Sequence, residues 1–325
     1  MANKARDFIP ALKFGHKIHP EDLAGFIGRP HVGDIYYVDP TNGSDTANSG
    51  TSWDDAFASV GTAYTNCTDN NYDVIILAPG THSSSAEASA ITWSKDHITL
   101  IGNVAPVGMS QRARMLASAS VSPMITVSGY GNVFKNVQLA SWNDNNILVT
   151  VSGSRNYFEN VHFAGIGNAT AGDDTAARCL YLNGGQENRF VDCTFGVDTV
   201  ARSTTNATVE FASAASRNVF ENCRFLMYAD NVGPNHVLFT GTSAIDRWVE
   251  FKNCVWYAFW VNDADKVTHV IDMSAQTTTG DCLMTGSQVM VGFDDWEAAD
   301  SSNLWFEPAS ATANAIGIGI NPNVS

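Results

Sequence analysis

Three pairs of adjacent aspartates are the residues of this chain whose types best suit chemistry. They are Asp54-Asp55, Asp173-Asp174 and Asp294-Asp295. Clustered carboxylates bind Ca²⁺, and two carboxylates that flank a glycosidic bond act as general acid and base in its hydrolysis. Both chemistries need the carboxylates to converge, whereas these pairs lie far apart along the chain. We therefore expect solvated loops at these positions, with neither a metal ion nor a cofactor.

Other motifs of catalysis do not occur in the sequence. It contains no CxxC pair, P-loop, dinucleotide-binding fingerprint or nucleophile motif, and its histidines lack the spacing of metal ligands. His162 shares an outward position with Gln138 and Arg224 in the repeat described next, which predicts a surface residue. Any chemistry therefore depends on what the fold brings together.

A short phrase occurs five times and indicates that fold. It consists of an aromatic residue, any residue, Asn or Asp, Val or Cys, any residue, and a large apolar residue. The copies begin at Phe134, Phe158, Phe190, Phe220 and Phe251, at spacings of 24, 32, 30 and 31 residues. Self-similarity at such a period is typical of a solenoid.

The Asn or Asp of each copy predicts a sharp corner. The Val or Cys and the last apolar residue are two apart, so on a strand they share a face. Phe precedes the Val or Cys by three, so on a continuous strand it would lie on the opposite face. A corner between Phe and the Val or Cys brings both to one side, and Asn and Asp tolerate the left-handed conformation that such a corner requires. The corner residues are Asn136, Asn160, Asp192, Asn222 and Asn253. We expect a column of corners and a column of Phe side chains, acting as scaffold and not as ligands.

A further short strand precedes each copy, for example in residues 147–153 and 179–184, and no helical pattern intervenes. Each period thus holds three short strands. This predicts an all-β fold, a parallel β-helix with three sheets and coils of about 24–32 residues. An antiparallel sandwich or barrel also has many short strands, but it does not require the same corner residue at the same offset.

The repeat divides the chain into three parts. We expect an extended N-terminal arm in residues 1–33, the β-helix with its cap in 34–290, and a C-terminal cap or tail in 291–325. The arm carries apolar and basic side chains, and no coil of the repeat is available to bury them. Ordering such a segment costs conformational entropy, which burial against another surface offsets. Its predicted partner-binding residues are Phe8, Ile9, Leu12, Lys13, Phe14, Lys17 and Ile18. Another protein is the expected partner, with the β-helix itself or a sister subunit as alternatives.

Charge and hydropathy exclude several classes of partner. The net charge is −15, with five basic and three acidic residues giving the arm +2 and leaving −17 on the rest. Such an acidic chain is unsuited to neutralising phosphates, which argues against nucleic acid. No run of 18 apolar residues predicts a membrane span, and the first residues lack the apolar region of a signal peptide.

Three of the six cysteines occupy one position of the repeat. Cys193, Cys223 and Cys254 stand where Val137 and Val161 stand in earlier coils. They therefore behave as small buried hydrophobic residues. We expect reduced thiols stacked in the core, which fits assembly in a reducing cytoplasm.

The N-terminal part of the body carries a family resemblance. Segments 37–39, 42–45, 75–81 and 98–102 resemble the opening of pectate-lyase-like right-handed β-helix proteins, and with the repeats the likeness covers about residues 34–290. It implies a single-stranded, right-handed β-helix and leaves the chemistry open, because a fold is not a function. With the short arm and no signal peptide, the chain resembles virion surface proteins of tailed bacteriophages.

The resemblance also suggests where an active site would lie. Pectate lyases hold Ca²⁺ with clustered carboxylates beside an Arg or Lys base, and Asp173, Asp174 and Arg178 are the best match to that set. A solvated loop is the favoured interpretation of these three. Four tryptophans are candidates for a sugar-binding groove, with core or end-cap packing as the alternative: Trp142, Trp248, Trp256 and Trp260.

Three functions follow from these observations. We favour a structural virion protein, a capsid decoration or cement protein without enzymatic activity, which the arm attaches to the major capsid protein or another virion protein after assembly in the host cytoplasm. The alternatives are a tailspike or fibre that binds or cleaves a host glycan, and a bacterial carbohydrate-active enzyme. A homotrimer is expected, because three parallel β-helices pack well side by side.

Overall fold

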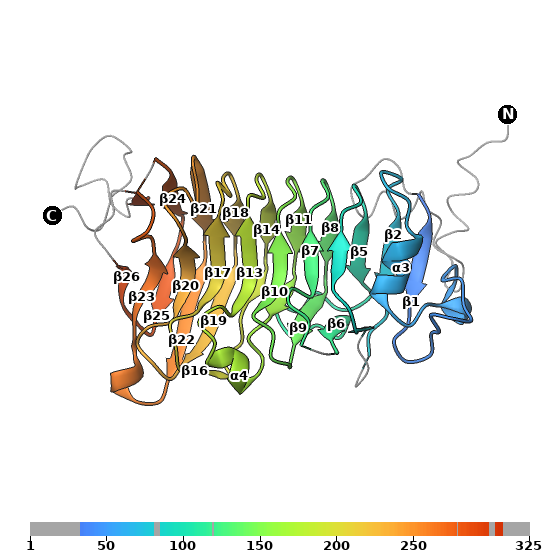
Figure 1. The fold of residues 1–325 in the computed structure, drawn as a ribbon, viewed down its shortest axis with the longest axis horizontal. Coiled ribbons are helices and arrows are strands. Elements are labelled where there is room, and N and C mark those ends of the chain that lie inside the picture. Colours follow the sequence, from blue (N-terminus) through green and yellow to red (C-terminus); the bar gives the residue numbers. More distant parts are fainter. Residues whose placement is uncertain (1–32, 81–84, 119, 278, 299–302, 308–325) are drawn as a thin grey trace.

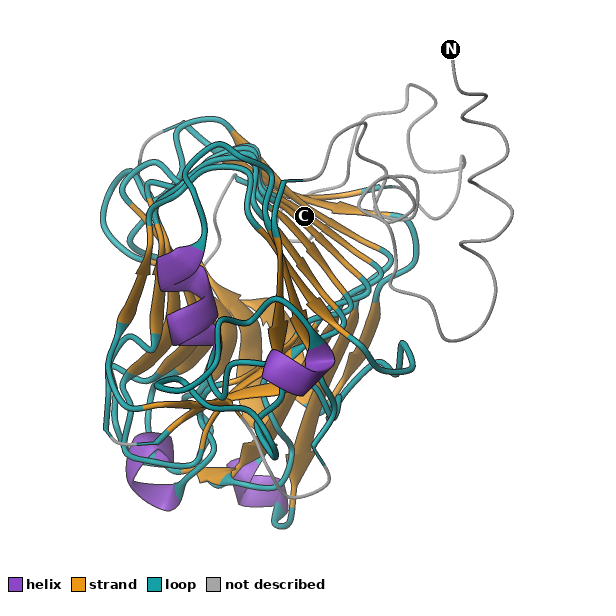
Figure 2. Cartoon of the chain, turned by 90° about the vertical axis from the view of Figure 1, so that its right-hand side faces the viewer, coloured by secondary structure: helices purple, strands orange, loops and turns teal. Residues whose placement is uncertain are grey.

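The computed structural model describes residues 33–80, 85–118, 120–277, 279–298 and 303–307. In these residues, three sheets of parallel strands wind around one elongated apolar core (Figures 1 and 2). The predicted all-β parallel β-helix is therefore confirmed. The seven residues predicted to bind a partner all lie in residues 1–32, outside the described residues.

Sheet A runs along the whole described body and contains the strand of each leading Phe. Its strands, in spatial order, are β1 (Ile35–Val38), β2 (Val74–Leu77), β5 (Thr99–Gly102), β8 (Val133–Lys135), β11 (Tyr157–Glu159), β14 (Arg189–Val191), β18 (Val219–Glu221), β21 (Trp248–Lys252), β24 (Asp281–Thr285) and β27 (Leu304–Phe306). The copies of the phrase pair in register, so that Phe158 lies between Phe134 and Phe190.

Sheet B follows the corner residue of each coil. Its strands are β3 (Ser85–Glu87), β6 (Arg114–Ala117), β9 (Gln138–Ser141), β12 (His162–Ala164), β15 (Thr194–Phe195), β19 (Arg224–Ala229), β22 (Val255–Trp260) and β25 (Val289–Val291), with β16 (Ala201–Arg202) also paired to β19.

Sheet C completes each coil before the chain returns to sheet A. Its strands are β4 (Ile91–Trp93), β7 (Ile125–Val127), β10 (Ile147–Val151), β13 (Arg178–Asn183), β17 (Ala207–Ala212), β20 (Asn235–Phe239), β23 (Val267–Asp272) and β26 (Phe293–Glu297). One coil thus runs from sheet C through sheet A to sheet B, and we name its three corners C–A, A–B and B–C.

The A–B corner is a one-residue turn, as predicted. The φ angles there are positive, at 56° for Asn136, 51° for Asn160, 54° for Asp192, 56° for Asn222 and 53° for Asn253. Successive corners stack, and the Asn160 amide donates to Asn136 Oδ1 at 3.0 Å. These residues are therefore part of the scaffold.

Aromatic columns fill the core beside this corner. Rings of Phe134, Phe158, Phe190, Phe220 and Phe251 stack with centroids 4.5–4.9 Å apart. A second column on sheet B contains Phe163, Phe195, Phe225 and Trp256. Offset stacks of this kind add to the free energy of burial. Identical residues recur because each ring packs on the ring of the next coil.

Between these columns lie the predicted cysteines. Cys193, Cys223 and Cys254 are fully buried on successive coils, and all six cysteines have free thiols. Each of the three donates a weak hydrogen bond, 3.5 Å long, to the carbonyl oxygen of the Phe in the preceding coil. The thiol thus fits the position that Val137 and Val161 fill in earlier coils.

Helices are short and lie in the connections between strands. They are the 3-10 helix η1 (Trp53–Asp55), α3 (Val60–Asn66), α4 (Ala169–Gly172) and the 3-10 helix η2 (Asp263–Asp265). Helix α3 packs against the core through Val60, Ala63 and Tyr64. It begins at the cap Ser59, whose side chain accepts a hydrogen bond from the backbone of Thr62. Strands β26 and β27 add to sheets C and A beyond residue 290, and the domain boundaries stay a prediction.

Candidate functional site

The residues that best match a lyase site do not converge. Asp173 ends helix α4 and accepts a hydrogen bond from the Ser203 hydroxyl. Asp174 accepts one from the backbone of Ala176 at 2.8 Å. Arg178 lies at the start of β13, and its guanidinium forms an ion pair with neither Asp173 nor Asp174. The three side chains therefore have separate structural contacts, which fits the favoured interpretation of a loop.

Arg178 instead forms a buried ion pair on sheet C. Its Nε lies 2.6 Å from Glu210 Oε2, and the two side chains are 7% and 13% exposed. The other Glu210 oxygen accepts from the Thr240 hydroxyl at 2.6 Å. Burial raises the pKa of the neighbouring Tyr181, and the Glu210 charge adds to this rise. With both carboxylate oxygens occupied, Glu210 is bound as a structural anion.

The other two aspartate pairs also have structural partners of their own. Asp55 Oδ2 accepts hydrogen bonds from the backbone and hydroxyl of Ser49, and Asp294 pairs with Lys266 at 2.5 Å. Across the described residues, no three His, Cys, Asp or Glu side chains are grouped so that they could hold a metal ion. Of the four tryptophans, Trp256 lies in the core column, Trp142 is 44% and Trp248 36% exposed, and Trp260 ends β22 and is partly exposed.

An inner asparagine ladder at the C–A corner was missed by the sequence analysis. Its members are the fully buried Asn132, Asn156, Asn188 and Asn218. In each neighbouring pair, the backbone N–H of one donates to the side-chain oxygen of the next at 2.9 Å. The signal was present, because each of these residues precedes a leading Phe by two. In four of the five copies the phrase is thus Asn-x-Phe-x-Asn/Asp, and the fifth has Val249 in place of the first Asn.

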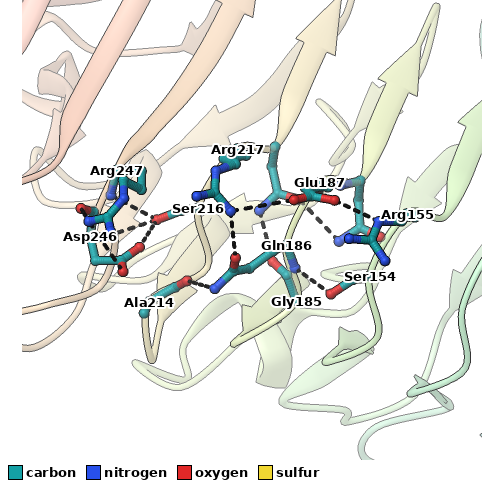
Figure 3. Close-up of polar contacts among 12 residues, drawn as sticks. Ser154, Arg155, Gly185, Gln186, Glu187, Ala214, Ser216, Arg217, Asp246 and Arg247 are labelled. Atoms are coloured by element: carbon teal, nitrogen blue, oxygen red, sulfur yellow. Dashed lines mark hydrogen bonds and ion pairs between the residues drawn. The ribbon is translucent and has the colours of Figure 1, made fainter.

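Outside this ladder, charged side chains form a ridge that follows the same corner (Figure 3). Glu187 lies between Arg155, at 2.7 Å, and Arg217, at 3.4 Å. One coil further, the Ser216 hydroxyl donates to Asp246 at 2.6 Å. Exposed pairs of this kind contribute little to stability individually. Their alternating signs give the ridge a regular polar surface.

His162 is not the surface residue that its repeat position predicted. It is buried under the loop of residues 103–113, whose Ser110 N–H donates to His162 Nδ1 at 3.0 Å. The proton is therefore on Nε2, which donates to the carbonyl of Gly196 at 2.9 Å. Burial lowers the pKa of His162, and the charge of Arg114 adds to this effect. The loop has no copy in later coils, so the repeat gave no sign of it.

A second buried polar chain lies between sheets B and C. Arg202 Nη1 donates to the Thr208 hydroxyl at 3.0 Å, and this oxygen lies 3.1 Å from His236 Nδ1. His236 Nε2 lies 3.2 Å from the carbonyl oxygen of Tyr257. Burial lowers the pKa of Arg202 to about 10, so its guanidinium stays charged at neutral pH. Its Nε and Nη2 have no hydrogen-bond partner among the described residues.

Comparisons with known proteins identify the fold. Similar structures include a pectate lyase (16% identity, 86% of this chain and 79% of that chain, TM-score 0.52) and a pectin methylesterase from Erwinia chrysanthemi (15%, 87% and 96%, TM-score 0.50). A pectin methylesterase from Aspergillus niger matches at 12% identity over 84% and 83%, with a TM-score of 0.52.

No family model and no curated protein matches the sequence. Within the described ranges, no helix has the length and apolar character to cross a membrane. At these identities the likeness concerns architecture alone. The chain therefore has the right-handed parallel β-helix fold that is found in pectate lyases and pectin methylesterases.

Proposed function

We propose that this chain is a structural protein of a bacteriophage virion, a capsid decoration or cement protein in which the β-helix forms a rigid rod. One observation carries the proposal: the polar residues that recur along the coils bind one another. The inner ladder from Asn132 to Asn218 is bonded from coil to coil inside the core. Such repetition stiffens the rod along its axis and leaves these side chains no role toward a substrate.

The N-terminal arm is the proposed attachment. It continues into the body at Gly33, whose N–H donates to the carbonyl of Tyr72 at 3.1 Å. An apolar cluster lies beside this point on the outer face of sheet A, where Val74, Ile76 and Ile101 pack with two side chains of β1. Both features support an attachment at the β1 end of the rod. The −17 charge of the remainder favours its solubility.

Substitution in the arm tests the attachment in the full-length protein. Phe8, Phe14 and Ile18 would be changed together to Asp, and binding to particles that lack this protein would be measured by co-sedimentation. We expect loss of binding with an unchanged melting temperature. The matched control is Val261→Asp, at a side chain that is 63% exposed near the opposite end. Normal binding of the triple variant would contradict the arm as anchor.

The proposal includes the absence of polysaccharide cleavage. Assays for reducing sugars and unsaturated products on bacterial capsular polysaccharides and pectins should remain at background. Cleavage that Asp173→Ala or Asp174→Ala abolishes would instead favour a tailspike depolymerase, the alternative with a host glycan as substrate. A homotrimer of side-by-side rods is part of the proposal, and sedimentation of the full chain tests it.

A further inference from the structure

One guanidinium of the molecule is fully buried beside sheet B. Arg202 ends the two-residue strand β16, which pairs with the end of β19, and its side chain is among the largest that the fold buries completely. A guanidinium stays protonated in proteins, so this side chain brings a positive charge into the core. A buried charge is costly unless a group of opposite charge compensates it. The surroundings of Arg202 therefore have to be examined for such a group.

A chain of neutral groups lies on one side of the guanidinium. Arg202 Nη1 donates to the Thr208 hydroxyl at 3.0 Å, and that hydroxyl lies 3.1 Å from His236 Nδ1. His236 Nε2 donates to the carbonyl of Tyr257 at 3.2 Å, so Nδ1 accepts from the hydroxyl. Burial lowers the pKa of His236 well below its usual value, and the charge of Arg202 adds to this effect. The chain thus satisfies one donor of Arg202 and leaves its charge uncompensated.

The opposite edge of the guanidinium has no partner. Nε and Nη2 lie on this edge with their N–H bonds parallel, and neither forms a hydrogen bond with a described residue. No Asp or Glu of the described residues forms an ion pair with Arg202. The neighbouring Arg178 is already paired with Glu210, and the buried Cys179 thiol makes no hydrogen bond with the guanidinium. Two parallel donors and one positive charge therefore remain.

This edge has the chemistry of an anion site. Parallel N–H groups of a guanidinium bind an anion through two charge-assisted hydrogen bonds. Water would satisfy both donors but would not compensate the charge. The space is narrow, because Gly196 passes beside the edge and even a Cβ there would lie only 3.1 Å from Arg202 Nη2. A single-atom anion that only accepts hydrogen bonds meets these conditions, because the site offers two donors and no acceptor.

We propose that the Nε–Nη2 edge of Arg202 binds a chloride ion, which serves as a buried counter-ion between sheets B and C. The ion belongs to the interior of one rod, so the inference does not depend on the virion role. It stabilises the folded chain without being essential to it, because the hydrogen bond of Nη1 with Thr208 remains when the ion is absent.

Urea denaturation of the full-length protein tests the site, in 100 mM sodium chloride and in 100 mM sodium gluconate, whose anion is too large for an enclosed position. We expect the equilibrium constant of unfolding to be about fivefold lower in chloride, as for a dissociation constant of about 25 mM. Arg202→Met should remove this difference between the two salts. Arg155→Gln is the matched control, because it removes a guanidinium from the exposed ridge, and it should keep the difference.

Crystals of the parent protein grown in sodium bromide give a second readout that needs no variant. We expect an anomalous peak for bromide beside Nε and Nη2 of Arg202, and this peak alone decides the matter if Arg202→Met does not fold. Chloride-dependent stability that Arg202→Met loses and Arg155→Gln keeps supports the site. An equal salt effect in parent and Arg202→Met would show a nonspecific action of the salt and overturn the proposal. Absence of the bromide peak, which would leave water on this edge, would overturn it as well.

Discussion

The A–B and B–C corners of the same coils follow opposite rules. At the A–B corner, five consecutive coils turn on one Asn or Asp with φ between 51° and 56°. At the B–C corner, the linkers differ in length and content, from residues 142–146 to residues 165–177 with helix α4. The first corner is uniform because each residue there stacks on its own copy. The second is free to vary because its loops lie outside the stacked strands.

The two corners also differ in the buried residues beside them. Near the A–B corner, the aromatic columns and thiols repeat, so one coil predicts the next. Arg178 and Arg202, both buried near the B–C corner, have no equivalents in other coils. The energetic consequences of this contrast can be measured, and the following predictions run from the largest expected effect to the smallest.

Removing a ring from the regular column should be most damaging. Phe190 is fully buried and stacks on Phe158 and Phe220 at 4.7 and 4.5 Å. We expect Phe190→Ala to lower the free energy of unfolding by about 3–5 kcal/mol in urea denaturation, because it leaves a cavity. Phe259→Ala is the control, at a ring that is 40% exposed, and should cost less than about 1 kcal/mol. Similar losses in both variants would contradict the role of the column.

The two buried arginines of the B–C side should behave in opposite ways. Arg178→Met leaves the Glu210 carboxylate without its ion-pair partner, and we expect a loss of about 3 kcal/mol in the free energy of unfolding. Arg202→Met removes a buried charge without an ion-pair partner among the described residues. Its free energy of unfolding should therefore lie within about 1 kcal/mol of the parent's value or above it. A large loss in Arg202→Met would show that this guanidinium has a partner essential to the fold.

Buried histidines on both sides should make stability depend on pH. Burial lowers the pKa of His162 and, more strongly, of His236 below 6.5. Below pH 6.5 the unfolded chain binds these protons and the folded chain does not, so the free energy of unfolding falls as the pH falls.

The expected slope is about 1.4 kcal/mol per pH unit for each histidine, down to the pKa in the folded state. His162→Gln uses the residue found at position 138 and should remove one histidine's share of the slope, with His236 retaining its own. Urea denaturation between pH 5 and 8 gives the slopes. Identical slopes for the parent and His162→Gln would contradict the assignment.

The smallest effect is expected for a thiol of the regular column. Cys223 occupies a position that is Val in two earlier coils, so Cys223→Val should change the free energy of unfolding by less than about 1.5 kcal/mol. Burial raises the pKa of the Cys223 thiol well above its usual value, which keeps it protonated and unreactive at neutral pH. A disulfide among Cys193, Cys223 and Cys254 in non-reducing mass spectrometry would refute this account.

The uniform corner is what the sequence made predictable. Asn136 and its four counterparts, the Phe column and the buried thiols follow from one phrase, because stacking of like on like leaves the same residue type at the same offset. The inner ladder from Asn132 to Asn218 was equally encoded and was overlooked. Its residues lie two positions before the first residue of the phrase.

The irregular features were not predictable in the same way. The burial of His162 depends on the single loop of residues 103–113. The pairing of Arg178 with Glu210 joins residues 32 positions apart, and the equivalent positions in neighbouring coils hold Ile147 and Leu238. The lyase-like set Asp173, Asp174 and Arg178 illustrates the limit, because neighbours in sequence were separated by the turn after helix α4.

Electron cryomicroscopy of particles that carry this protein tests the central claim most directly. The account predicts a straight rod on the virion surface that contacts the shell at the end formed by β1, with the β24–β27 end pointing away. Density in which the rod lies attached by its side or by its C-terminal end, or in which residues 1–33 contact nothing, would contradict it.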